Sequence, residues 1–400
     1  MPSSISSGRS AAANVRGMQP VSRRSRVAPF EVMRVLDAAS RRRSLGLPTF
    51  DLSAGQPGTP APVQVLEAAR QVLTTDRLGY TPASGIPQLR QAIAGHYQAR
   101  YDLAVHAEDV VVTTGSSGGF LLAFLAAFDA GDEVVLARPG YPAYRNLLDV
   151  LGCRVVEIDA GPAENFTITT AMLDRLPRPP EGLVLASPAN PTGTLTDPQT
   201  LADVVAWCAE HGTRLVSDEI YHGLVYRGTA DTAWRTSRDP IVVNSFSKYF
   251  SMTGWRLGWL LVPAGLRDPI DALASNMALC PPALSQHAAI RAFEAYAELD
   301  GHTRHYRTNR DLLVAGLTSL GLDRLAPADG AFYVYADVSA ITGDSAVLCA
   351  RALAEAGVAI APGADFDTVG GHRWIRMSFA GATTEVTGAV DALRRWLPSF

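Results

Sequence analysis

The chain carries a single lysine, Lys248, although lysine and arginine together account for 35 of its 400 residues. Arginine stays protonated in proteins and cannot act as an amine nucleophile, whereas a lysine held away from water or near other cations can. Lys248 is therefore a candidate for covalent chemistry that needs an amine. Composition alone is also compatible with an ordinary surface lysine that has no function and remains in the sequence by chance.

A run of small residues, Gly115-Ser116-Ser117-Gly118-Gly119, lies between an expected strand and an apolar helix. Backbone N–H groups at the start of such a helix, together with the helix dipole, favour an anion such as phosphate. The run has no lysine and lacks the G-x-G-x-x-G spacing, which disfavours nucleotide binding. The run therefore predicts a binding site for a phosphate group that does not belong to a nucleotide.

Other polar side chains lie at or just beyond the ends of expected strands. Ligands of mainly parallel sheets bind outside the carboxyl ends of the strands, so we expect these side chains to converge. An aspartate there is also compatible with a simple helix cap. Taken together, however, these side chains indicate one site, because they bring a carboxylate, a phenol, an amide, an amine and a guanidinium to the same edge of the sheet. They belong to Asp218, Tyr221, Asn190, Lys248 and Arg256.

The elements that would position these residues are short β-branched runs that alternate with helical segments between about residues 108 and 262. This alternation predicts an α/β fold, a three-layer α/β/α large domain with a mainly parallel seven-stranded sheet. The expected strands are Val110–Thr113, Glu133–Leu136, Arg154–Ile158, Leu183–Ala186, Arg214–Ser217, Ile241–Asn244 and Leu257–Val262.

The flanking sequence predicts a smaller α+β domain. Its expected elements are a helix from Phe30 to about Leu45, a long helix after about 300, strands near 331–336 and 373–378, and a final helix from about 383; a further helix is expected over about 62–74. We therefore expect three parts: a flexible N-terminal arm over 1–28, a large domain over 62–300, and a small domain formed by 29–61 and 301–400.

Composition narrows the class of protein. With 47% hydrophobic and 18% charged residues, the chain has the usage of a globular enzyme. A net charge of −4 gives no reason to expect nucleic acid or an anionic membrane as a partner. No apolar run is long enough for a membrane span or typical of a signal peptide, so we expect a cytoplasmic location. The four scattered cysteines predict neither a zinc site nor a disulfide framework.

In order along the chain, Asn190-Pro-Thr-Gly and Ser245-x-Ser-Lys248 resemble motifs of the class I and II aminotransferases. These fold-type I enzymes depend on pyridoxal 5′-phosphate (PLP), and the resemblance covers about Gly55 to Ala380. It implies transfer of an amino group between an amino acid and a 2-oxo acid, in amino acid metabolism and biosynthesis. Lys248 would form an internal aldimine with the cofactor and then move a proton.

The same resemblance implies roles around the cofactor ring. Asp218 matches the aspartate that pairs with the pyridine nitrogen and keeps it protonated. Tyr221 and Asn190 match the groups that hydrogen-bond the phenolic oxygen, and by the same resemblance Asn190 would also reach the substrate carboxylate. Tyr141 matches the aromatic residue that stacks on the ring.

For the cofactor phosphate, the resemblance implies backbone donors, hydroxyl groups and a guanidinium from Ser116, Ser117, Ser245 and Arg256. Tyr80 matches a tyrosine that reaches the phosphate bound by the neighbouring subunit. The resemblance therefore implies a homodimer with shared active sites.

For the substrate, Arg376 resembles the arginine that grips the α-carboxylate, and Gly55 the glycine whose backbone lines the site. The segment Asn276–Pro282 is less polar than the Ser/Thr-rich segment that relatives have there. This difference disfavours aspartate or glutamate and predicts an apolar or unusual amino acid as substrate.

Two other functions stay open. The same lysine, aspartate and phosphate cradle support a PLP-dependent lyase or synthase, resembling aminocyclopropane-carboxylate synthase, that performs elimination, cyclisation or carbon–carbon bond formation. The second open function is that of a PLP-binding regulatory module fused to a DNA-binding domain. It is disfavoured because only about 28 residues precede the first expected helix and no basic recognition helix is visible.

Overall fold

The structure, a computed structural model, describes residues 21–400. The predicted arm over 1–28 therefore lies mostly outside the described residues. Its described part, residues 21–28, is exposed and contains one turn of 3-10 helix, Arg23–Ser25.

A seven-stranded sheet forms the larger part of the molecule, in the order β2-β8-β7-β6-β5-β3-β4. Strand β8 pairs antiparallel with both of its neighbours, and the remaining pairs are parallel. All seven expected strands are present, which confirms the predicted sheet. They are β2 (Val110–Thr113), β3 (Glu133–Arg138), β4 (Arg154–Asp159), β5 (Gly182–Ala186), β6 (Arg214–Asp218), β7 (Ile241–Ser245) and β8 (Gly258–Leu261).

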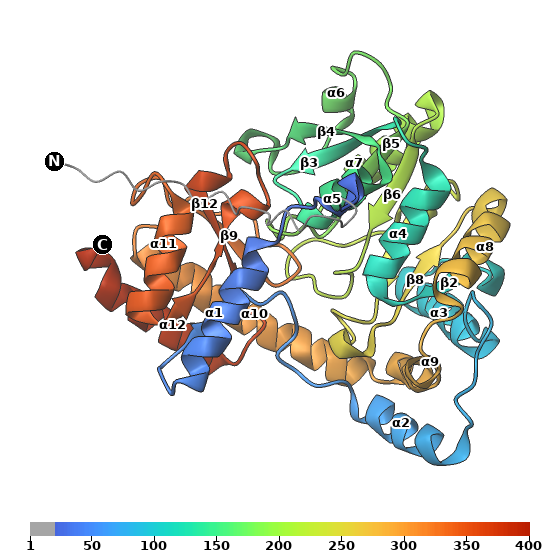
Figure 1. Ribbon diagram of the computed structural model, residues 1–400, viewed down its shortest axis with the longest axis horizontal. Coiled ribbons are helices and arrows are strands. Elements are labelled where there is room, and N and C mark those ends of the chain that lie inside the picture. The colour runs from blue at the N-terminus through green and yellow to red at the C-terminus, as the bar shows by residue number, and fades with distance from the viewer. Residues whose placement is uncertain (1–20) are drawn as a thin grey trace, which may run out of the picture.

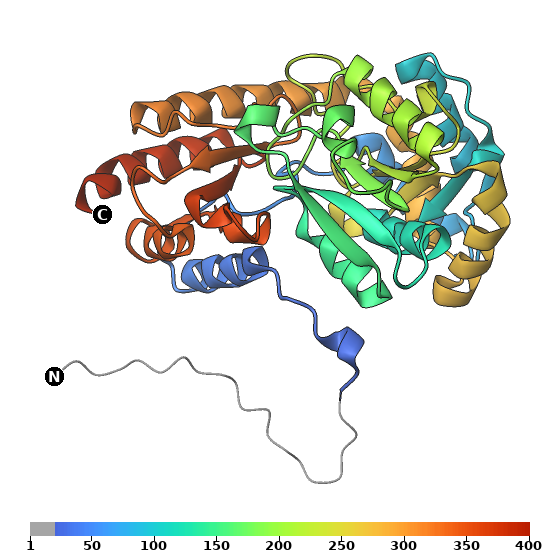
Figure 2. The ribbon, with the colours of Figure 1, turned by 90° about the horizontal axis from the view of Figure 1, so that it is seen from above.

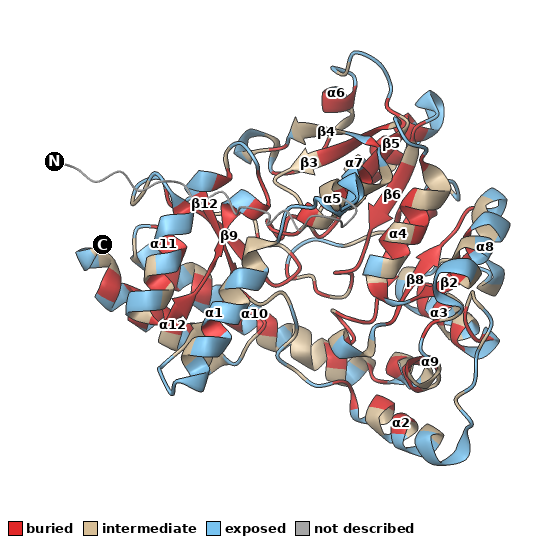
Figure 3. Ribbon diagram, in the orientation of Figure 1, coloured by how far each residue is buried: buried red, intermediate tan, exposed pale blue. Residues whose placement is uncertain are grey.

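Helices cover both faces of this sheet, and its central strands are buried between them (Figures 2 and 3). One face carries α4 (Gly115–Ala127), α5 (Pro142–Leu151) and α8 (Arg267–Ala278). The other carries α3 (Pro87–Tyr101) and α7 (Pro198–His211), and α2 (Val63–Thr75) packs against α9 (Ala283–Ala289) at one end. The short α6 (Thr170–Leu173) contacts α7. This is the three-layer arrangement expected from the sequence.

Helix α7 shows how local sequence places the strand that ends in the site. Asp197 caps the helix by accepting from the amides of Gln199 and Thr200, both 3.1 Å away. Pro198 follows at the first helical position, and Gly212 ends the helix with a φ of 68°. The chain then enters β6, whose last residue is Asp218.

A smaller α+β part lies beside the large sheet (Figure 1). Its antiparallel sheet has the order β11-β12-β9, and a second, parallel pair joins β1 to β10. The N-terminal segment thus lies among C-terminal elements. The elements are α1 (Glu31–Ser44), β1 (Phe50–Asp51), α10 (Tyr296–Ser319), β9 (Tyr333–Asp337), α11 (Ser345–Arg351), β10 (Val358–Ala359), β11 (Ala361–Pro362), β12 (Trp374–Ser378) and α12 (Thr383–Trp396).

The domain limits at residues 61 and 301 remain our proposal, since α10 begins at Tyr296 and runs across the second of them. Within residues 21–400, no helix is long and apolar enough to cross a membrane.

Candidate active site

A cavity of about 270 Å³ opens at the carboxyl ends of β5, β6 and β7, next to the smaller α+β part. Ten of the twelve site residues predicted from the sequence line it. They are Gly55, Ser116, Ser117, Tyr141, Asn190, Asp218, Tyr221, Lys248, Arg256 and Arg376. Residues far apart in the chain therefore meet in one place. The two predicted residues that do not line the cavity are Ser245 and Tyr80.

Lys248 follows the end of β7 and points its amine across the cavity. Its Nζ donates to the carbonyl oxygen of Gly55 at 2.6 Å and lies over the ring of Tyr221, 5.5 Å from its centroid. Burial lowers the pKa of Lys248 to about 8, helped by the charges of Arg376 and Arg256 and opposed by Asp218. A substantial fraction of neutral amine is thus present near neutral pH.

The lowered pKa of Lys248 gives a prediction for its reaction with an added aromatic aldehyde. The neutral fraction of the amine rises about ten-fold per pH unit below the pKa, so the rate of imine formation should rise to about pH 8 and then level off. Stopped-flow absorbance measures this rate. A simple alkylamine is the control, because any titration of the aldehyde itself affects both reactions alike. A protein rate that climbs to pH 10.5 in parallel with the alkylamine would contradict the lowered pKa.

Asp218, the last residue of β6, is buried with 3% of its surface exposed. The Tyr144 hydroxyl donates to its Oδ2, and the amide of Ile220 donates to Oδ1 at 3.1 Å. Burial raises the pKa of Asp218 to about 6, while these two donors and Lys248 oppose that rise. Asp218 is therefore an ionised carboxylate at neutral pH, in a place where a buried cation would be strongly stabilised.

Arg376, on β12, forms the opposite wall and is 3% exposed. Its Nη1 donates to Asn190 Oδ1 at 3.1 Å and its Nη2 to the carbonyl of Ser53 at 2.8 Å. The guanidinium lies 4.4 Å from the ring centroid of Tyr333 and 4.7 Å from that of Phe366. Its Nε is buried without a hydrogen-bond partner among the described residues. A buried cation in this state is well suited to bind a carboxylate.

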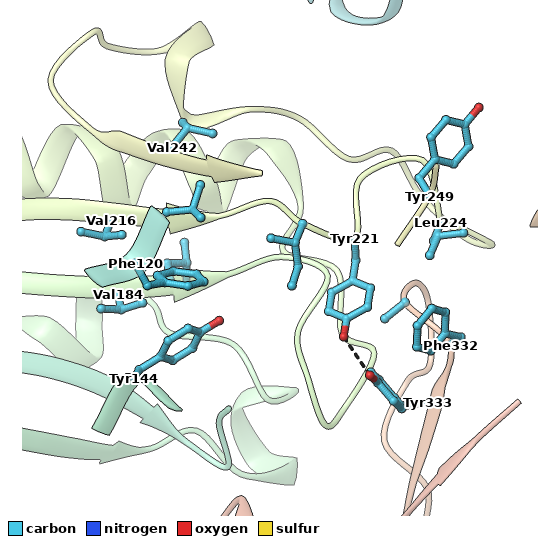
Figure 4. Close-up of a cluster of buried hydrophobic side chains, with 14 of the residues drawn as sticks. Phe120, Tyr144, Val184, Val216, Tyr221, Leu224, Val242, Tyr249, Phe332 and Tyr333 are labelled. Atoms are coloured by element: carbon cyan, nitrogen blue, oxygen red, sulfur yellow. Dashed lines mark hydrogen bonds between the residues drawn. The ribbon is translucent and has the colours of Figure 1, made fainter. Parts of the chain in front are cut away.

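Two tyrosines connect the sides of the cavity. The hydroxyl groups of Tyr221 and Tyr333 lie 2.8 Å apart (Figure 4). Burial keeps the pKa of Tyr221 well above 10, so its hydroxyl stays protonated and can donate. Gly55 makes this approach possible, because a Cβ atom there would lie 2.7 Å from the Tyr333 hydroxyl.

The N-terminus of α4 forms a cradle with the arginine that precedes β8. Gly115 has a φ of 69°, and a Cβ on it would lie 2.6 Å from Arg256 Nη2. Thr114 gives the helix no side-chain cap, so the amides of the first turn have no side-chain acceptor. Ser116, Ser117 and Arg256 line the cavity beside them. This set of donors fits a phosphate group.

Ser245 supports this cradle from behind. Its hydroxyl donates to Ser247 Oγ at 2.8 Å and accepts from the Ser247 amide at 3.0 Å. It is Ser247, together with Thr253, that lines the cavity. Ser245 is thus separated from the cavity by the residue whose hydroxyl it contacts.

Tyr80 is the other predicted residue outside the cavity. Its side chain is 85% exposed, beside a separate surface pocket that also includes Thr114, Cys280 and Pro281. The ring therefore lies near the start of α4 but on the outer surface, where another molecule can contact it.

Several residues that shape the cavity carried no role in the sequence prediction. Tyr144 is the hydrogen-bond donor to Asp218. It lies three residues beyond Tyr141 in the run Pro139-Gly-Tyr-Pro-Ala-Tyr144, and this closeness in sequence is the signal that could have identified it. Tyr333 and Phe366, which flank Arg376, have no comparable motif. Apolar residues at the start of α1 also line the cavity: Phe30, Val32, Met33 and Leu36.

An amine, a buried carboxylate and an anion cradle thus meet at the strand ends of one sheet, where α/β proteins bind their ligands. The chain belongs to the class I and II aminotransferases, since a model of that family matches residues 48–393. It is an enzyme that transfers an amino group between an amino acid and a 2-oxo acid.

Its relatives are named for this activity. The chain is 56% identical over 384 residues to a valine–pyruvate aminotransferase of Mycobacterium tuberculosis, covering 95% of this chain and 99% of the relative. It is 35% identical to an aspartate/prephenate aminotransferase of Thermus thermophilus, with the same coverage. A crystal structure of an aminotransferase from Mycobacterium tuberculosis matches with a TM-score of 0.94 and 55% identity, covering 96% of this chain and all of that one.

Proposed function

We propose that this aminotransferase uses PLP bound through Lys248 and takes an apolar amino acid such as valine as donor, with pyruvate or a similar 2-oxo acid as acceptor. The observation that carries the proposal is the cavity itself. Lys248 and Arg376 are placed for the amine and carboxylate ends of a substrate, and apolar side chains of α1 form a further wall. Transfer of an amino group from an apolar amino acid to a 2-oxo acid needs an amine, a cation for the carboxylate and an apolar surface for the side chain.

The family uses PLP, and the described residues fit that group. When bound, PLP withdraws the electrons released as the substrate α-proton leaves. Lys248 would supply the covalent attachment and then hold and return that proton. Asp218 would keep a positive charge on the ring nitrogen, Tyr221 and Asn190 would donate to the phenolic oxygen, and Tyr141 would pack against the ring.

The phosphate end is assigned to the α4 cradle. The backbone amides of Ser116 and Ser117 and the guanidinium of Arg256 would hold the cofactor phosphate. The Ser247 hydroxyl lies beside them and is oriented by Ser245. Gly55 leaves space on the substrate side.

An apolar donor agrees with the charges around the cavity. Among the described residues that line it, the cations are Lys248, Arg256 and Arg376, and each is already assigned to cofactor or α-carboxylate. A dicarboxylic substrate needs one more. The name of the valine–pyruvate relative supports the same donor class, and the aminotransferase names of the relatives favour transfer over the lyase, synthase and regulatory alternatives.

Replacing Arg376 with glutamine tests the carboxylate clamp. Hydrogen bonds to charged groups are worth about 1.5–3 kcal/mol each, so losing two should raise the KM for donor and acceptor by about a hundred-fold or more. Steady-state kinetics with valine and pyruvate measure this effect. Arg373→Gln, a change at a nearby exposed arginine, is the matched control and should leave both KM values unchanged. Equal effects of the two changes would count against the clamp.

The homodimer with shared active sites and the cytoplasmic location stay predictions. The dimer is supported by the exposure of Tyr80 and of two apolar neighbours of its pocket residues, Met277 and Leu279, which are 48% and 56% exposed. Exposed apolar side chains that lie together are typical of protein contacts. Tyr80 would then reach the cofactor phosphate of the partner subunit.

A further inference from the structure

Helix α1 is capped by a residue from the other end of the chain. Phe30, at the N-cap position, provides no side-chain hydrogen bond. Instead, Asp365 accepts the amide of Glu31 on Oδ1 at 2.9 Å and the amide of Val32 on Oδ2 at 2.8 Å. The Asp365 side chain is mostly buried and its charge lies at the positive end of the helix dipole.

The packing of α1 leaves its first turn dependent on this cap. Ala39 is the helix's buried residue, and the contacts of Arg42 with the carbonyls of Pro48 and Ala354 lie toward its C-terminal end. In the first turn, Val32 packs on the buried cluster that includes Phe366. Phe30 stacks on Tyr141, with ring centroids 6.3 Å apart. The cap and these two contacts together fix where the helix begins.

Asp365 itself is held by the loop that follows β11. The carbonyl of Phe366 accepts from the amide of Gly140 at 2.9 Å, and Asp367 lies 3.1 Å from Arg138 Nε in an ion pair. Gly140 and Arg138 belong to the end of β3 and the turn before Tyr141. The loop thus positions Asp365 relative to the cofactor side of the cavity.

The capped turn faces the cavity with apolar side chains. Phe30, Val32, Met33 and Leu36 line it along with Asp365 and Phe366. In a substrate whose carboxylate binds Arg376 and whose amine approaches Lys248, the side chain is the group left to contact this wall.

We propose that Asp365 is a specificity-determining positioning residue: by capping α1 it holds the apolar wall over the substrate side chain and so favours valine over alanine. The inference rests on the proposed apolar donor. Alanine shares the amine and carboxylate of valine but has only a methyl group to reach the wall, so loss of the wall's position affects the two donors unequally.

The test is the ratio of kcat/KM for valine to that for alanine in the cofactor-loaded enzyme. Asp365→Asn keeps the shape of the side chain but removes its charge and turns an NH2 group toward one helix amide. The ratio should fall at least five-fold, mainly through the KM for valine. Asp344→Asn is the matched control, since Asp344 caps α11 through the amides of Ala346 and Val347, away from the cavity; it should leave the ratio within two-fold of wild type.

The Met33→Ser variant provides a second test, which changes the apolar wall directly and leaves the cap in place. Met33 is 54% exposed, so the change should be tolerated, and it should lower the same ratio. A folded Asp365→Asn enzyme with an unchanged ratio, or with equal losses for both donors, would overturn the inference. If Asp365→Asn fails to fold, an unchanged ratio in Met33→Ser overturns it. A wild-type enzyme that uses alanine but not valine would overturn the proposal of valine as donor and this inference with it.

Discussion

Lys248→Ala enzyme should lose the covalent link to its cofactor and lower kcat for amino transfer by roughly 10⁴-fold or more, because one side chain supplies both the attachment and the proton transfer. Lys248 is the only lysine, so no other side-chain amine of the chain can replace it. Borohydride reduction followed by mass measurement detects the link, and kinetics with valine and pyruvate measure the loss.

Lys248→Arg is the matched control for charge. It keeps a cation near Asp218, but a guanidinium cannot be deprotonated and cannot serve as the amine. Circular dichroism shows whether both variants keep the fold. If either variant formed a reducible cofactor adduct or retained wild-type turnover, the role of Lys248 would be wrong.

Asp218→Asn should lower kcat by about 10²–10³-fold, the range seen when one preorganised electrostatic group is removed from an active site. In the proposed function the buried carboxylate would stabilise positive charge on the cofactor ring, and a neutral amide of the same size would not. Cofactor should still bind through Lys248. Single-turnover kinetics with valine measure the chemical step, and a wild-type rate in this variant would exclude the assigned role.

Tyr144→Phe tests the same carboxylate without removing it. The Tyr144 hydroxyl donates to Asp218 and lowers a pKa that burial raises to about 6. Without that donor the pKa of Asp218 in the cofactor-free protein should move upward, so protonation begins at a higher pH. Cofactor affinity should then decline at a higher pH than in the wild type, as measured by fluorescence titration across the acid range. An unshifted profile would mean that Tyr144 does not tune Asp218.

The large sheet was predictable because its signals are local. Each strand is a short β-branched run bounded by polar or glycine-rich sequence, so β2 was predicted to the residue and β8 to within a residue at either end. The two-residue strands β1, β10 and β11 were not predicted, since two residues show no periodicity. The pairing of β1 with β10 depends on tertiary contacts between the two ends of the chain, whereas β11 pairs with the nearby β12.

The site was predictable where a motif follows a strand end, as with Asn190, Asp218 and Lys248. The prediction chose Ser245 rather than Ser247, whereas Ser247 lines the cavity. Ser245 is the last residue of β7 and the chain turns beyond it, so strand alternation could not guide the choice between them. The cap of α1 by Asp365 joins residues 334 positions apart through backbone amides, which carry no side-chain signal. Such contacts appear only once the chain is folded.

One experiment tests both the attachment of the cofactor to Lys248 and the transfer of an amino group from valine to that cofactor. Enzyme loaded with PLP is reduced with borohydride either before or after incubation with excess valine, without any 2-oxo acid. Reduction beforehand should fix the cofactor to the peptide that contains Lys248. After valine, that label should be lost, with pyridoxamine phosphate and about one equivalent of the valine-derived 2-oxo acid formed per chain. A label on another residue, or a cofactor that stays bound to Lys248 with no 2-oxo acid released, would contradict an aminotransferase built on this lysine.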